Sequence, residues 1–332
     1  MPTRYIVAVL VFGFGLAGCG NRSSPLPTAP ELSGAEIARN YLNEVVDVMQ
    51  AHSFKRKIVN WTVLRAEALS AASAATTIET TAPGILRALA LLNDSHSQYR
   101  PAPGSRANAI GYSSKQCSFT KIPNPAVPAD IGYVRVSGFS GTFAQSIAFA
   151  DSVLAQIRSA DRDGLAGWIV DLRGNTGGNM WPMLAGLGPI LGDGLVGHFN
   201  DPDGVIDRWD IRLTSSLLNG VVLGHTSESY VLRSPAPRVA LLVDRGVMSS
   251  GEATFIAFRG RPNTRSFGLP SCGLSTAVAG YELSDASTLF LAQSTMADRS
   301  GLAYGDQVVP DEIIDDVVSA AVTRAIAWLR GS

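Results

Sequence analysis

A serine stands where a predicted buried strand gives way to a predicted helix. The run RVALLVD at 238–244 is typical of a buried strand, and SSGEATFIAF, which begins at Ser249, is typical of a helix start. Ser249 followed by Glu252 before an apolar run indicates a capping box. A helix N-terminus also offers free N–H groups that can stabilise an oxyanion, so this serine equally suits a nucleophile. Locally, Ser249 is either a cap or a nucleophile.

A second strand-like run, GWIVDLR at 167–173, leads into the glycine-rich turn GNTGG at 174–178. Glycines at the carboxyl end of a strand let backbone N–H groups approach a ligand oxygen closely. The turn matches neither G-x-G-x-x-G nor G-x-x-x-x-G-K-[ST], so an oxyanion hole suits it better than a phosphate cradle, and a plain tight turn is the alternative. We predict that the N–H groups of Gly178 and Ser250 hold the oxyanion of an acyl-transfer intermediate.

A nucleophilic serine needs a base, and the sequence offers lysines or histidines. The lysines all precede the main predicted strands: Lys55, Lys57, Lys115 and Lys121. Three histidines lie on a polar helix end or in an unassigned polar region: His52, His198 and His225. His96, in LLNDSHSQYR, lies where a predicted helix ends and faces the core, a position from which an imidazole could reach Ser249 as acid or base. Taken alone, His96 suits a cap partner at that helix end better than a base.

The elements that must position these residues fall into two parts. Residues 34–93 show helical periodicity and predict a small helical subdomain. From about residue 105 the pattern alternates, with strands predicted at 131–139, 167–173, 238–244 and 288–295 and helices at 143–160, 180–191, from 249 onward and at 310–329. Residues 196–230 are polar, hairpin-like and unassigned. The alternation predicts an α/β core with parallel neighbouring strands.

Composition describes a globular protein with a substantial core. Apolar residues make up 46% and charged residues 17% of the 332 residues, and the net charge is −1 without a basic or acidic block. Nothing in this charge pattern indicates a nucleic-acid partner. Cys117 and Cys272 can pair in an oxidising compartment, although their spacing does not decide it. Neither has a second ligand at metal-binding spacing, so we expect no metal site and no cofactor.

The N-terminus predicts export. Arg4 precedes an apolar run that ends at Leu16, which is short for a membrane span and typical of a secretory signal. The ending LAGC resembles the bacterial lipobox, which implies lipidation of Cys19; an ordinary signal peptide is the alternative. Gly20 after that cysteine resembles lipoproteins sorted to an outer membrane. The Ser- and Pro-rich residues that follow predict a flexible tether.

Three fragments in order, DSHS, VDLRGNTGG and SSGE, resemble the tail-specific (C-terminal processing) and tricorn-type serine peptidases over roughly residues 34–330. The resemblance implies a crotonase/ClpP-like α/β core of mixed sheet and helices. It also implies roles for five residues: Ser249 as nucleophile, Gly178 and Ser250 as oxyanion hole, His96 as base, and Ser95 as the residue that orients the imidazole.

The sequence departs from that family in three places. Leu274, in PSCGLST, stands where the processing-protease branch has its lysine, which favours His96 as base. About 35 residues separate His96 from the strand at 131, too few for the PDZ domain usual in that branch. The acidic fourth member of the tricorn-like site has no match, and Asp298 and Asp306 are the candidates.

The sequence therefore predicts a signal peptide at 1–18, a tether at 19–33, a helical subdomain at 34–104 and a peptidase core at 105–332. We interpret the chain as a lipid-anchored serine endopeptidase of the bacterial cell envelope, facing the periplasm from the outer membrane. Its partners are then a peptide or protein substrate and, through the lipid, the membrane. The alternative is an inactive relative that binds peptides or small hydrophobic ligands in the same cleft.

Overall fold

A computed structural model describes residues 32–105, 107–118 and 120–331. The predicted signal peptide, Cys19 and all but the last two residues of the tether lie outside the described residues. None of the helices in the described ranges combines the length and apolar character needed to cross a membrane.

The core is a parallel five-stranded sheet in the order β13-β10-β9-β4-β3. Every residue of the central strands β4 and β9 is buried, as expected for parallel strands covered on both faces. The predicted α/β core with parallel neighbours is confirmed. The strands are β3 (Ile131–Arg135), β4 (Gly167–Asp171), β9 (Val239–Val243), β10 (Thr264–Gly268) and β13 (Glu312–Ile313).

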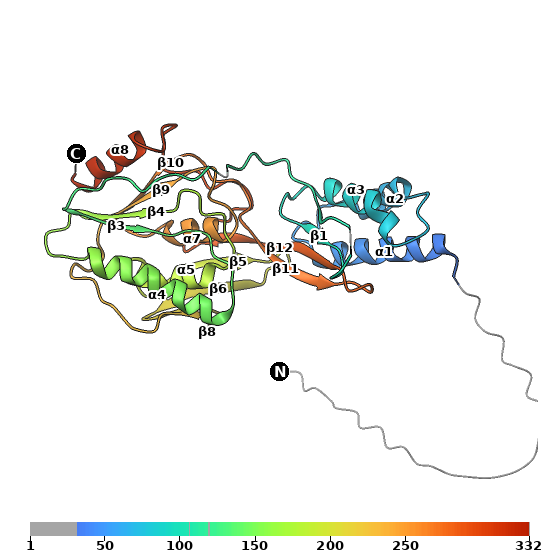
Figure 1. Ribbon diagram of the computed structural model, residues 1–332, viewed down its shortest axis with the longest axis horizontal. Coiled ribbons are helices and arrows are strands. Elements are labelled where there is room, and N and C mark those ends of the chain that lie inside the picture. The colour runs from blue at the N-terminus through green and yellow to red at the C-terminus, as the bar shows by residue number, and fades with distance from the viewer. Residues whose placement is uncertain (1–31, 106, 119, 332) are drawn as a thin grey trace, which may run out of the picture.

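Helices cover both faces of this sheet (Figure 1). Helix α8 packs on one face, where Ala321, Ala325 and Leu329 join one apolar cluster with β4, β9 and β10. On the other face, α7 is buried along its whole length between the parallel sheet and a second sheet. The helices are α4 (Phe143–Ala160), α5 (Met180–Gly186), α6 (Gly188–Leu191), α7 (Ser250–Phe258) and α8 (Ala320–Leu329).

The prediction of a closing helix from residue 310 was wrong in its first half. Residues 312–313 form strand β13 instead, and α8 begins only at Ala320. The physical reason is Asp316, whose carboxylate accepts hydrogen bonds from the N–H groups of Val318 and Ser319 at 3.0 Å each and of Ala320 at 3.2 Å. These side-chain hydrogen bonds compete with the backbone hydrogen bonds of a helix, so the helix begins only after this turn.

The second sheet is antiparallel and contains the region left unassigned from the sequence. Its order is β2-β1-β12-β5-β6-β7-β8, with β11 paired to β12. The strands are β1 (Gln98–Arg100), β2 (Ile110–Gly111), β5 (Gly194–Asn200), β6 (Ile206–Arg212), β7 (Ser215–Leu218), β8 (Val221–His225), β11 (Thr276–Glu282) and β12 (Thr288–Asp298).

The N-terminal helices form a lobe that shares a hairpin with the core (Figure 1). They are α1 (Gly34–His52), α2 (Trp61–Ala71), the short η1 (Glu79–Thr81) and α3 (Ala82–Leu92). Their apolar faces pack on Leu283, Leu289 and Leu291 of the β11–β12 hairpin. Strand β1 pairs with β12 as well. The lobe is therefore built from two separate parts of the chain, and the segment between α3 and β1 is fixed to the sheet that reaches the core.

Candidate active site

Ser249 lies at the junction between the loop after β9 and helix α7. Its backbone has φ 53° and ψ −119°, a sparsely populated combination for a residue with a side chain, which costs about 1–3 kcal/mol. The predicted capping box with Glu252 is present, but its two halves differ. The Ser249 N–H donates to Glu252 Oε2 at 2.9 Å, whereas the Ser249 hydroxyl makes no ordinary cap hydrogen bond. Glu252 thus holds the backbone of Ser249 through its carboxylate.

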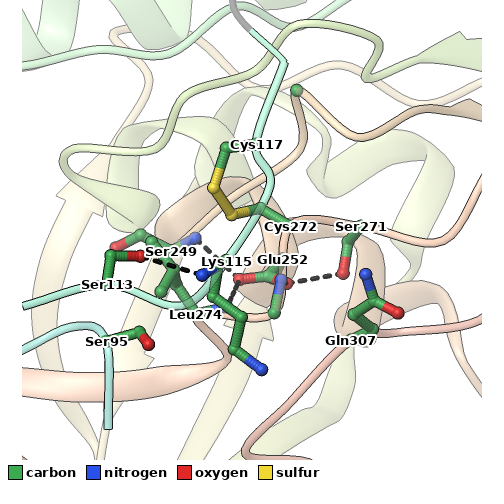
Figure 2. Close-up of a disulfide and its surroundings, with 12 residues drawn as sticks. Ser95, Ser113, Lys115, Cys117, Ser249, Glu252, Ser271, Cys272, Leu274 and Gln307 are labelled. Carbon is green, nitrogen blue, oxygen red and sulfur yellow. Dashed lines mark hydrogen bonds between the residues drawn. A yellow bond between two sulfur atoms is a disulfide. The ribbon is translucent and has the colours of Figure 1, made fainter. Parts of the chain in front are cut away.

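The Glu252 carboxylate, which is fully buried, is the centre of this junction. Besides the Ser249 N–H, it accepts hydrogen bonds from Ser271 Oγ at 2.5 Å and from the N–H groups of Gly273 at 2.8 Å and Leu274 at 2.7 Å. Burial raises the pKa of Glu252 to about 7, although these four donors favour its anion. Glu252 therefore ties the start of α7 to the segment 271–274 (Figure 2).

A disulfide joins that segment to a distant part of the chain. Cys117 and Cys272, separated by 155 residues, are bonded to each other, with their Cα atoms 4.9 Å apart. The neighbouring Ser118 N–H donates to the Arg245 carbonyl at 3.0 Å. The pairing left open by the sequence is therefore present, and it lies beside Glu252 and Leu274 (Figure 2).

The glycine-rich turn packs against the start of α7 at a distance that only glycine permits. A Cβ on Gly177 would lie 2.9 Å from the Ser249 Cβ, and one on Gly178 would lie 1.9 Å from the Phe139 carbonyl oxygen. Gly178 also has φ 110°, which strains any other residue. The Ser250 hydroxyl donates to the Gly178 carbonyl at 2.7 Å and locks the two segments together.

The two N–H groups predicted to form the oxyanion hole are unbonded. Within the described ranges, neither the Gly178 N–H nor the Ser250 N–H donates a hydrogen bond. By contrast, the N–H of the preceding residue, Gly177, is hydrogen-bonded, because it donates to Asn175 Oδ1 at 3.0 Å. Gly178 is exposed, so a ligand can reach its N–H. Two free donors beside a serine hydroxyl can stabilise a tetrahedral oxyanion.

His96 is fixed by the DSHS segment in which it occurs. Asp94 Oδ1 accepts from the His96 N–H at 2.9 Å and from the Ser97 N–H at 2.7 Å, which is an Asx-type turn. Ser97 Oγ in turn accepts from the Ala292 N–H of β12 at 3.0 Å. The histidine backbone is therefore anchored to the sheet shared by lobe and core.

The imidazole itself contacts Thr276, the first residue of β11. His96 Nδ1 lies 2.8 Å from Thr276 Oγ1. Burial lowers the pKa of His96 to about 4, against the opposing effect of the nearby Asp94 carboxylate. The ring is therefore neutral at neutral pH and carries a lone pair that can accept a proton.

The expectation that Ser95 orients this ring is not met by its contacts. Ser95 Oγ instead accepts from the Ser114 N–H at 3.1 Å and lies 3.3 Å from the Ser114 hydroxyl. Its own backbone has φ 60°, within the tight turn between α3 and β1. The structure gives the contact with His96 Nδ1 to Thr276.

Neither acidic candidate for a fourth member contacts His96 or Ser95 in the described part of the chain. Asp298 closes its own turn, accepting from Ser300 Oγ at 2.5 Å and from Tyr304 Oη at 3.0 Å. Asp306 forms an ion pair with Lys115 Nζ at 2.6 Å. The carboxylates are therefore already engaged by local partners.

Ser249 and His96 belong to one connected cluster. The Glu252 carboxylate accepts hydrogen bonds from the N–H groups of both Ser249 and Leu274. The Leu274 carbonyl in turn accepts from the Thr276 N–H at 2.8 Å, and the Thr276 hydroxyl contacts the His96 imidazole. Among the described residues no direct hydrogen bond joins the Ser249 hydroxyl to the imidazole. Catalytic hydrogen bonds of this kind often tighten only when substrate binds.

Lys115 belongs to the segment that the disulfide joins to residues 271–274. The Lys115 side chain is directed away from Ser249 (Figure 2). Its ammonium is held by Asp306, so it does not serve as a neutral base in this arrangement. The other histidines lie elsewhere: His52 stacks on Tyr281, His198 contacts the Asp298 carbonyl and His225 the Thr226 carbonyl.

Comparison with known proteins identifies the family of this chain. A profile of peptidase family S41 matches residues 130–314, more than half of the chain. The chain belongs to peptidase family S41. It is 28% identical over 219 residues to the nisin-resistance protein of Lactococcus lactis subsp. lactis, a match that covers 64% of this chain and 65% of that protein.

Two solved structures share the S41 fold of this chain. A lipoprotein from Streptococcus agalactiae aligns with a TM-score of 0.64 at 21% identity, covering 92% of this chain and 98% of that one. The photosystem II D1 C-terminal processing protease aligns with a TM-score of 0.55 at 17% identity, covering 89% and 97%. The mixed arrangement of sheets and helices predicted from the sequence is confirmed by these neighbours.

The S41 match contains Ser249, the glycine turn and Thr276, whereas His96 lies before it. Sequence reasoning overlooked two residues, Thr276 and Asp94, although both stand inside motifs that it examined. Asp94 begins DSHS, and an aspartate two residues before a histidine predicts an Asx turn. Thr276 ends PSCGLST, but nothing local in the sequence links it to a histidine 180 positions away.

Proposed function

We propose that this member of family S41 is a lipid-anchored serine endopeptidase that faces the periplasm from the outer membrane, with Cys19 as the lipidated residue. Its substrate is a peptide or protein. The observation that carries the peptidase proposal is the pair of unbonded N–H groups, on Gly178 and Ser250, beside the strained Ser249. The likeness of the fold to a lipoprotein from Streptococcus agalactiae supports the anchor.

In the proposed reaction, His96 takes the hydroxyl proton of Ser249 as the serine oxygen attacks the scissile carbonyl carbon. The carbonyl oxygen becomes an oxyanion and accepts hydrogen bonds from the Gly178 and Ser250 N–H groups. The protonated imidazole then gives its proton to the leaving amine, and an acyl-enzyme forms on Ser249. Water, activated by the same imidazole, hydrolyses that ester.

Thr276 takes the orienting role in this proposal, in place of Ser95. When Nδ1 carries the proton and donates to Thr276 Oγ1, Nε2 holds the lone pair that accepts the serine proton. A neutral hydroxyl stabilises the imidazolium less than a carboxylate does.

The test is active-site labelling of the mature protein with a fluorophosphonate, followed by mass-spectrometric mapping of the tagged residue. We expect the tag on Ser249, and we expect Ser249→Ala to lose labelling and about 10⁴-fold or more in peptide cleavage while folding normally. His96→Ala should lose both as well. Labelling that persists in Ser249→Ala would refute the assignment. A protein that binds peptides, never cleaves them and is unchanged by His96→Ala would instead be the inactive relative.

A further inference from the structure

A pocket of about 360 Å³ opens where the helical lobe meets the core. The end of α1 and the loop after it line the pocket from the lobe, and the turn between β5 and β6 lines it from the core. Strands β11 and β12, which both parts share, complete the lining. We call it the seam pocket, and its lining includes His52, Arg56, Asp207, Tyr281, Gln293 and Ser294.

The seam pocket lies on the opposite face of the β11–β12 pair from the imidazole. Thr276, which contacts His96, is paired in register with Thr295. The neighbouring pair is Ala277 with Ser294. Successive side chains of a strand point to opposite faces of the sheet. Because Ser294 lines the seam pocket, this pocket lies across the sheet from the Thr276–His96 contact and outside the catalytic cleft.

One carboxylate of the seam pocket has no cation. Arg56 forms ion pairs with both Asp201 and Asp203, and Lys57 Nζ lies 2.8 Å from Asp203 Oδ1. Asp207 is half-buried, and within the described ranges its carboxylate makes no ion pair and accepts only from a neutral side-chain amide, at 2.7 Å. Two cations thus face three carboxylates, and the surplus negative charge resides on Asp207.

A buried hydroxyl of the seam pocket also lacks a partner. Ser294 is only 6% exposed, yet its hydroxyl makes no hydrogen bond with any residue that the structure describes. Beside it, Gln293 Oε1 accepts from Tyr281 Oη at 2.8 Å and keeps a second lone pair. A buried polar group without a partner costs free energy, so a ligand that hydrogen-bonds to Ser294 is stabilised there.

The remaining wall is aromatic. His52 stacks on Tyr281, with ring centroids 4.3 Å apart and an interplanar angle of 19°. Such a wall packs against methylene groups and attracts a cation to the ring face. A metal ion does not match this lining, because in the described part of the chain no group of His, Cys, Asp or Glu side chains could hold one.

These features together match a primary ammonium on an alkyl chain. Its charge pairs with the Asp207 carboxylate, and its three N–H donors also reach the Ser294 hydroxyl and Gln293 Oε1. Its methylene groups lie along the aromatic wall. We propose that the seam pocket binds an alkylammonium group, carried by a lysine side chain of a peptide or by a free amine. Since lobe and core both line the pocket, the bound group bridges the two parts.

The test is calorimetric binding to the Ser249→Ala protein, in which no peptide is cleaved. Three probes are compared: acetyl-Gly-Lys-Gly-amide, the same peptide with norleucine in place of lysine, and pentylamine. We expect the lysine peptide to bind about tenfold or more tightly than the norleucine peptide, as for one charge-assisted hydrogen bond. Pentylamine that binds as tightly as the lysine peptide would identify the amine alone as sufficient, and weaker binding would identify a peptide lysine. Equal affinity of the two peptides would overturn the inference.

NMR signals of the histidine rings locate the bound group. The His52 signals should shift on binding, because this ring lines the seam pocket, whereas those of His225 should not. Binding that leaves the His52 signals unchanged would place the ligand elsewhere and overturn the site.

Variants assign the contacts. Asp207→Asn keeps the shape of the side chain and should abolish the preference for lysine, and Ser294→Ala should weaken it. Asp315→Asn is the matched control and should keep the preference, because this exposed carboxylate makes no hydrogen bond or ion pair in the described ranges. A preference for lysine that survives Asp207→Asn refutes the site. None of these assays needs turnover, so a failure of the peptidase proposal remains distinguishable from a failure of the seam pocket.

Discussion

The protonation of His96 gives the sharpest quantitative test of the site. An ordinary histidine titrates near pH 6.5, whereas burial lowers the pKa of His96 to about 4. At about pH 5.5, a base with pKa 4 is about 97% neutral, and one with pKa 6.5 is about 9% neutral. The structure therefore predicts roughly tenfold more active base at this pH than an exposed histidine would provide.

The assay is kcat/KM for peptide cleavage from about pH 3.5 to pH 8, combined with NMR titration of the histidine rings. We expect the fall in kcat/KM that reports protonation of His96 to lie near pH 4. Glu252, whose pKa burial raises to about 7, titrates well above the His96 step near pH 4, and the ring signals assign that lower step to His96 directly. Thr276→Val should lower kcat and shift the step, and Thr276→Ser should restore both, because only the hydroxyl contacts Nδ1.

The same shift has a consequence for stability. Because the folded pKa lies below the unfolded one, the stabilisation is fully present above about pH 6.5 and is lost as pH falls toward 4. His96→Gln should flatten this part of the pH dependence in urea unfolding. A ring signal of His96 that titrates near pH 6.5, with an activity limb at the same pH, would refute the reasoning.

Three further predictions concern the scaffold of the site. Replacing Cys117 and Cys272 by serine should lower the free energy of unfolding by about 5 kcal/mol, because the bond closes a loop of 155 residues; an unchanged urea midpoint would contradict this. Glu252→Gln should destabilise the fold by about 2–4 kcal/mol in thermal or urea unfolding. The NH₂ group of the new amide would face two of the four hydrogen-bond donors that the carboxylate now accepts. Gly178→Ala should reduce peptide cleavage about 10²-fold or more, because the new Cβ would lie 1.9 Å from the Phe139 carbonyl and displace the oxyanion donor; wild-type kcat would be inconsistent with that role.

The sequence by itself determined the local elements and the residue types of the site. Buried parallel strands read as continuous apolar runs, so β4 and β9 were predictable, and α4 was predicted at its observed bounds. The capping box at Ser249 and the glycine turn at 174–178 are short-range patterns, set by which backbone conformations a glycine or a helix start requires. These signals need no knowledge of distant residues.

Only the tertiary structure decided which side chains meet. Thr276 rather than Ser95 contacts the imidazole, and Cys117 is bonded to Cys272, because β11, the turn after α3 and the disulfide-linked segment converge from distant parts of the chain. The carboxylate of Glu252 accepts four donors for the same reason. Such contacts depend on how packed elements are placed in space, and a one-dimensional pattern of apolar and polar residues carries no information about pairs that lie 180 positions apart.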